Sequence, residues 1–103
     1  MVDKNIYAFI GLAAKANKLI SGNYLCENAL IYKSVKMVII AQDANEGTVK
    51  KFENICKKKS INPIRFGYKE ELGKIIGKTG SRSVLCITCS HFAGRLHEMI
   101  VVE

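Results

Sequence analysis

Apolar residues recur at helical spacing in the first third of the chain. Ile6, Phe9, Ile10 and Ala13 stand at i, i+3, i+4 and i+7, which predicts a helix with one buried face. Asp3 precedes them as a candidate N-cap. Residues 18–22 then form a short extended link, and a second helix opens at Ser21 or Gly22 and runs to about Lys33. The residues expected to face inward from this helix are Leu25, Cys26, Ala29 and Leu30.

Three later segments have the pattern of β-strands. Residues 37–41 and 84–88 are short apolar runs, typical of strands buried on both faces. A shorter strand follows Pro63 at residues 64–66. Helical spacing returns between and after these runs, so strands alternate with helices. The alternation predicts an α/β fold, a three-layer α/β/α sandwich formed by residues 1–103 as one domain.

The three later helices each have a candidate inward face. The helix after Asn45 presents Val49, Phe52, Ile55 and Cys56. A short helix from Tyr68 to Ile76 presents Leu72, Ile75 and Ile76, and Gly77 is placed to end it in the left-handed conformation. Ser90 is a candidate cap for the last helix, which presents Phe92, Leu96, Met99 and Ile100.

Charge gives the first indication of function. The 103 residues include 16 Lys and Arg against nine Asp and Glu, a net charge of +7. A pI near 9.4 is typical of nucleic-acid-binding domains, although charge alone does not prove binding. The N-terminus has no uninterrupted apolar run of the signal-peptide kind, so we expect a cytoplasmic protein without membrane segments.

The four cysteines, Cys26, Cys56, Cys86 and Cys89, are expected to be free thiols in a reducing compartment. Cys86-Ile87-Thr88-Cys89 has the spacing of a redox dithiol, which makes a thiol enzyme an alternative function. Such a pair needs its first cysteine exposed, whereas Cys86 belongs to an apolar run, so packed thiols are the favoured interpretation. A zinc site using His91 would need a distant fourth ligand, and we expect no metal or cofactor.

Residues 73–79 superficially resemble a phosphate-binding loop. Only three residues separate Gly73 from Gly77, where the motif needs four. The segment also follows a helix and precedes a strand, the reverse of the required order. Nucleotide hydrolysis is therefore not supported.

The start of the second helix is the strongest local candidate for a binding site. Lys18, Ser21 and Gly22 lead into a helix N-terminus, whose free N–H groups attract phosphates. Tyr24 can stack on a base, and Asn28, four residues later on the same face, can pair with base edges. A plain helix start with a glycine cap remains the alternative.

The chain resembles, nearly end to end, the L-seven-Ae superfamily of large-subunit ribosomal proteins, which bind kink-turn RNA, and especially its small bacterial members. Four blocks carry the resemblance: GLAAKANKLISG at residues 11–22, KMVIIAQDA at 36–44, INP at 61–63 and KEELGKIIGK at 69–78. The resemblance implies an α/β/α sandwich with a four-stranded mixed sheet. It also implies a protein without catalytic activity.

The resemblance assigns an RNA-reading role to the helix after Gly22. Family members carry glycine, any residue, asparagine, glutamate, two further residues and lysine there. This chain keeps the glycine but has Tyr24 in place of the asparagine, Leu25 in place of the glutamate and Asn28 in place of the lysine. Losing the lysine removes a charge-assisted contact, so weaker kink-turn binding than in typical members is expected.

Further contacts follow from the matched blocks. Lys36 and Lys69 stand where members carry basic residues near the RNA backbone. Asp43 and Asn45 lie near the family's pocket for an extruded nucleotide, and Val49 is expected to help cradle that base.

Residues 78–83 correspond to a loop that helps set RNA preference, and the sheet is expected to bring this loop beside Gly22. One edge of the sandwich should then hold five cations: Lys18, Lys36, Lys69, Lys78 and Arg82. The full set of expected RNA contacts is Lys18, Ser21, Gly22, Asn23, Tyr24, Asn28, Lys36, Asp43, Asn45, Val49, Lys69, Lys78 and Arg82.

The sequence therefore predicts a monomeric, non-enzymatic protein that binds bent RNA and is related to the ribosome. Ribosomal RNA, a riboswitch leader and a small RNA remain open as targets. A protein-interaction module of the same fold is the principal alternative, because fold does not fix function.

Overall fold

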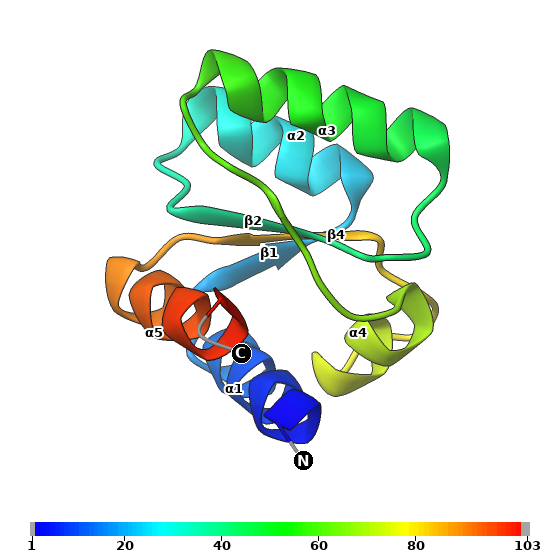
Figure 1. Cartoon of the computed structure of the whole chain (residues 1–103), viewed down its shortest axis with the longest axis vertical. Helices are drawn as coiled ribbons and strands as arrows, with labels where there is room; N and C mark the ends of the chain where they lie inside the picture. The colour runs from blue at the N-terminus through cyan, green and yellow to red at the C-terminus, as the bar shows by residue number, and fades with distance from the viewer. Residues whose placement is uncertain (1, 102–103) are drawn as a thin grey trace.

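The computed structural model describes residues 2–101 as helices and strands in regular alternation (Figure 1). The helices are α1 (Val2–Lys15), α2 (Asn23–Tyr32), α3 (Glu46–Lys58), α4 (Lys69–Ile75) and α5 (Ser90–Val101). The strands are β1 (Leu19–Ser21), β2 (Met37–Ile40), β3 (Ile64–Arg65) and β4 (Val84–Ile87).

The four strands form one mixed sheet in the order β1-β4-β2-β3. Strand β4 runs antiparallel to both of its neighbours, pairing Ser21 with Leu85 on one side and Ile39 with Leu85 on the other. Strand β3 is parallel to β2 at the far edge. As a result, β1 and β2 finish at the same end of the sheet at which β4 begins.

Helices cover both faces of the sheet, which confirms the expected α/β/α sandwich (Figure 1). Strands β2 and β4 are buried along their whole length because alternate residues enter opposite cores. Ile39, with Ile10 and Leu96, packs in the core under α1, α4 and α5. Val38 and Phe52 pack in the core under α2 and α3.

Several local expectations were wrong by a residue or a face. The link before Gly22 is extended as expected, and it also forms a strand, β1, since it pairs with β4. Asp3 lies inside the first turn of α1, and Ser90 is the first residue of α5, so neither is an N-cap. Leu25 and Ile75 were expected to face inward but are 55% and 38% exposed.

Within residues 2–101, each helix is too short or too polar to span a bilayer. All four cysteines are free thiols, as the sequence predicted.

Candidate nucleic-acid interface

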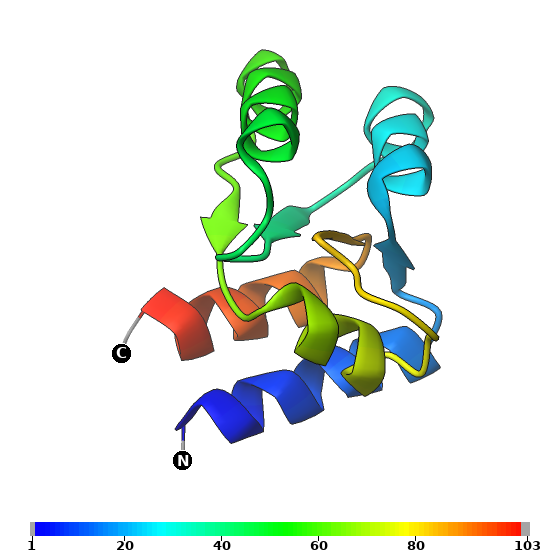
Figure 2. The same cartoon turned by 90° about the vertical axis from the view of Figure 1, so that its right-hand side faces the viewer.

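Strand direction divides the predicted site residues between two ends of the sheet. We call one end the Gly22 end: β1 and β2 finish there and β4 begins there. In Figure 2 this end faces the viewer, and the starts of α2, α3 and α4 lie at it. The opposite end, where β2 begins and β4 finishes, is named the Lys36 end. Most of the residues expected to contact RNA belong to the Gly22 end.

Gly22 itself joins β1 to α2 at this end. Its N–H donates to the carbonyl of Val84 at 3.0 Å, which fixes the helix start against β4. Its φ of 96° is a conformation open to glycine and strained for other residues. Among residues 2–101, no side chain caps α2, so the first N–H groups of this helix are not satisfied by a cap.

The loop before β4 lies beside this helix start, as expected. Together they line a groove of about 460 Å³ formed by Ser21, Gly22, Asn23, Tyr24, Leu25, Ser81, Arg82 and Ser83. Tyr24 is 73% exposed at its edge. The groove therefore combines an uncapped helix N-terminus, an exposed aromatic ring and a guanidinium group.

Backbone contacts with α4 hold this loop in position. The N–H of Arg82 donates to the carbonyl of Lys69 at 2.9 Å. The backbone of Gly80 packs tightly on α4 at Gly73. A Cβ added at Gly73 would clash with the carbonyl oxygen of Gly80. The Arg82 guanidinium donates to the carbonyls of Thr79 and Ser81 at 3.2 and 2.9 Å, which further compacts the loop.

Two residues expected to contact RNA, Asp43 and Asn45, also satisfy nearby helix starts. The Asp43 carboxylate accepts the N–H of Lys69 at 2.8 Å, which caps α4 from the loop after β2. The Asn45 side chain is the N-cap of α3 and accepts the N–H of Thr48 at 2.8 Å. Val49, also expected at the nucleotide pocket, is half-buried and packs against the core under α2 and α3.

Lys18 and Lys36 do not join the other cations, which corrects the expectation of a single basic edge. The N–H of Lys36 donates to the carbonyl of Ile87 at 2.8 Å, and the N–H of Thr88 donates to the carbonyl of Lys18 at 2.9 Å. Both lysines therefore lie at the Lys36 end, one strand length away from Gly22. Of the five cations, Lys69, Lys78 and Arg82 remain together, on α4 and the following loop.

Three residues that support the Gly22 end were not identified from the sequence: Arg65, Thr48 and Tyr7. The Arg65 guanidinium donates to the carbonyls of Ala41 and Gln42 at 3.3 and 3.0 Å, which braces the loop after β2. Asn23 Nδ2 lies 3.5 Å from Thr48 Oγ1, which connects the starts of α2 and α3. Asn45 stands three residues before Thr48, which is the spacing of a helix N-cap and could have pointed to Thr48, whereas nothing local signals Arg65.

Tyr7 is the third of these residues and connects α1 to the start of α4. Its hydroxyl accepts the N–H of Tyr68 at 3.1 Å and donates to Glu71 Oε1 at 3.2 Å. Burial, the nearby carboxylate of Glu71 and that of Asp3 raise the pKa of Tyr7, so it stays a neutral donor at physiological pH. The α4 segment is thus anchored from two sides, by Asp43 and by Tyr7.

The thiols do not form the exposed pair that a redox site needs. Cys86 is fully buried beside Cys26, and its thiol raises the pKa of Cys26, as does burial. Burial and the charge of Cys86 raise the pKa of Cys56 to about 11. Only Cys89 is partly exposed; hydrogen bonds from the backbone of Phe92 and His91, with the charge of Lys18, lower its pKa.

Comparison with known proteins places the chain in a family. Residues 4–95 match the Ribosomal protein L7Ae/L30e/S12e/Gadd45 family, and the chain belongs to it. It is 29% identical over 94 residues to "RNA-binding protein YlxQ" of Bacillus subtilis, covering 91% of this chain and 93% of the relative. It is 33% identical over 91 residues to the protein of the same name from Enterococcus faecium, covering 88% and 86%.

Solved structures agree with this assignment. A Bacillus halodurans protein described as having unknown function superimposes with a TM-score of 0.86 and 30% identity, covering 93% of this chain and 96% of that one. The Giardia lamblia 15.5kD RNA binding protein superimposes with a TM-score of 0.76 and 17% identity, covering 96% and 90%. This second likeness shows the shared fold.

The contact between Gly73 and Gly80 leads to a stability prediction. Gly73→Ala should push the loop off α4 and lower the free energy of unfolding by about 1–3 kcal/mol, the usual cost of overpacking. Gly94→Ala is the matched control, since Gly94 lies in α5 with open space around it, and it should be neutral or stabilise by up to about 1 kcal/mol. Urea denaturation measures both, and equal effects would contradict the tight approach.

The thiol environments predict selective alkylation. Iodoacetamide at neutral pH should add one adduct to the native protein, at Cys89, because its lowered pKa increases the thiolate fraction and it alone is partly exposed. Cys89→Ser should remove the adduct, as intact mass will show. Two adducts on the native wild type, at Cys86 and Cys89, would instead revive the dithiol interpretation.

Proposed function

We propose that this protein binds RNA at its Gly22 end and that the target is a kink-turn or a similarly bent internal loop, as part of a ribosome-related role. The observation that carries the proposal is the groove in which the uncapped start of α2 lies beside the Arg82 loop. Relatives that match almost the whole chain bear the name RNA-binding protein, which supports the same assignment.

Capping within the fold selects the helix end that receives phosphate. The starts of α2, α3 and α4 all lie at the Gly22 end, but Asn45 caps α3 and Asp43 caps α4. The first turns of α3 and α4 also carry the acidic residues Glu46, Glu70 and Glu71, whereas the first turn of α2 carries none, so the N–H groups of α2 are the best placed of the three to receive an anion. Because Gly22 has no Cβ and nothing lies within 4 Å of where one would stand, an RNA backbone can approach it closely.

The side chains around this helix start supply the remaining recognition chemistry. Lys69, Lys78 and Arg82 neutralise phosphates and release counterions. Tyr24 offers an exposed ring on which an unpaired base can stack, while Asn23 and Asn28 offer amide groups for base edges. Lys18 and Lys36 are proposed to meet only the flanking stem of a longer RNA, since they lie at the other end of the sheet.

A second candidate function is a protein-interaction module that uses the same fold. The exposed apolar side chains of α2 favour it, since Leu25, Ile31 and Tyr32 all face solvent. Titration of a kink-turn RNA against a plain duplex separates the two functions. Equal and weak binding to both RNAs would reject kink-turn recognition and favour the module.

Loss of a loop cation should reduce both affinity and salt dependence. Lys78→Ala is expected to weaken kink-turn binding and to flatten the slope of log K against log salt by roughly 0.7–0.9. Lys58→Ala removes the same charge from the far end of α3 and should leave that slope unchanged. Fluorescence anisotropy at several salt concentrations measures the slope, and identical slopes for the two variants would remove the loop from the interface.

Restoring the family's lysine tests how α2 docks. Asn28→Lys should tighten kink-turn binding about two- to tenfold, because a charge-assisted hydrogen bond is roughly twice as strong as a neutral one. Asn54→Lys adds the same charge on the exposed face of α3 and should change affinity little. If Asn28→Lys and Asn54→Lys bind the kink-turn RNA equally well, any gain in affinity comes from the added charge in general, and α2 does not dock on RNA as proposed.

A further inference from the structure

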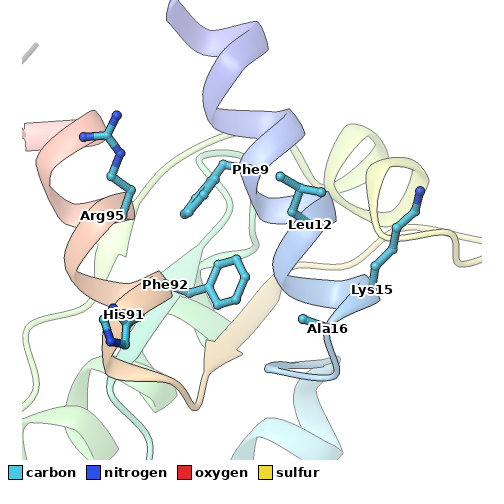
Figure 3. Close-up of a pocket in the computed structure, with 7 residues that line it drawn as sticks. All are labelled: Phe9, Leu12, Lys15, Ala16, His91, Phe92 and Arg95. Carbon is cyan, nitrogen blue, oxygen red and sulfur yellow. The ribbon is translucent and has the colours of Figure 1, made fainter.

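A second groove lies between α1 and α5, away from the Gly22 end of the sheet. It has a volume of about 620 Å³ and is lined by Phe9, Leu12, Lys15, Ala16, His91, Phe92 and Arg95 (Figure 3). None of the residues assigned to RNA binding lines it. The site at the Gly22 end therefore does not account for this groove.

The floor of this groove is apolar and incompletely covered. Phe9 and Phe92 extend toward each other from the two helices, with ring centroids 5.1 Å apart and planes tilted by 43° (Figure 3). Beside them Leu12 is 54% exposed, although α1 buries its other apolar face. An exposed leucine next to a half-buried aromatic pair provides apolar surface that a partner can remove from water.

The rim of the groove is cationic. Lys15 and Arg95 lie on opposite sides of the floor, and His91 stands near Phe92 (Figure 3). Among residues 2–101, none of those that line the groove is acidic. Within the part of the chain that the structure describes, Glu98 alone pairs with the rim, at 3.4 Å from Arg95. The pair is exposed, and such pairs are weak enough to exchange for a partner's carboxylate.

The groove also lies away from the Gly22 end of the sheet, where the bent part of the RNA is proposed to bind. Its Lys15 and His91 belong to the finish of α1 and the start of α5, which flank the Lys36 end of the sheet. The uncapped start of α2 lies at the Gly22 end. A partner in the groove and an RNA at the Gly22 end would therefore not exclude each other.

We propose that this groove binds a segment of another protein that presents apolar side chains flanked by Asp or Glu. Carboxylates match the rim because Lys and Arg offer only donors, and the apolar side chains cover Leu12, Phe9 and Phe92. A nucleobase fits less well. Its own donor groups would find few acceptors here, and the tilted rings pack on each other rather than forming a flat stacking surface.

The test uses a synthetic helical peptide with leucines at i, i+3, i+4 and i+7 and glutamates at its remaining positions. In amide NMR spectra of the full chain it should shift signals of residues 9–16 and 91–95 and leave those of residues 21–25 unchanged. A second peptide with lysine in place of each glutamate should not bind. Equal binding of the two peptides would overturn the proposal.

Variants locate the binding and separate it from RNA recognition. Leu12→Glu should lower the affinity for the acidic peptide at least about tenfold, as expected for an anchor residue. Lys15→Glu should also lower that affinity, and it leaves the apolar floor of the groove unaltered. Ile31→Glu is the matched control, since Ile31 is 52% exposed on α2 and outside the groove, and it should bind the peptide like wild type. Leu12→Glu should bind kink-turn RNA with the same affinity as wild type. This comparison holds whether the wild-type affinity for that RNA is high or low.

Two results would contradict the proposal. Unchanged peptide affinity in both Leu12→Glu and Lys15→Glu would place the peptide elsewhere. Displacement of the peptide by a short oligouridine, with the same amides of residues 9–16 shifted, would make the groove an RNA surface instead.

Discussion

The antiparallel pairing of β4 with both β1 and β2 determines which parts of this chain meet. It places Leu85 opposite Ser21 and Ile39, so the loop that precedes β4 must emerge between the segments that follow β1 and β2. The uncapped start of α2, the capped starts of α3 and α4 and the cations near Arg82 share one end of the sheet for this reason. A parallel β4 would carry that loop to the other end and separate it from Gly22.

The secondary structure and the cores were predictable because their signals are local. Spacing alone identified Ile6, Ile10 and Ala13 on α1 and Phe52 and Cys56 on α3, and all five are buried. The short apolar runs at β2 and β4 likewise indicated strands covered on both faces. The helix start at Gly22 was a local candidate for binding phosphate, and the resemblance to a family added the expectation that this helix reads RNA.

The errors arose where local pattern carries no information. Lys18 and Lys36 were assigned to the RNA edge because they are basic and belong to matched blocks, but strand direction decides the end on which they lie. Leu25 was placed inward on hydrophobicity, although α2 is apolar on more than one side. The approach of Gly80 to Gly73 depends on two segments packing together, so neither glycine predicts it.

The strands at the two margins of the sheet are shorter than those inside it. Strand β1 has three residues and β3 has two, while the inner strands have four each. Arg65, the last residue of β3, adds a charge at one margin. Short and charged margins offer little unpaired backbone on which a foreign strand can template itself. The short margins thus disfavour edge-to-edge pairing of sheets from different copies of this chain at high protein concentration, without help from its binding surfaces.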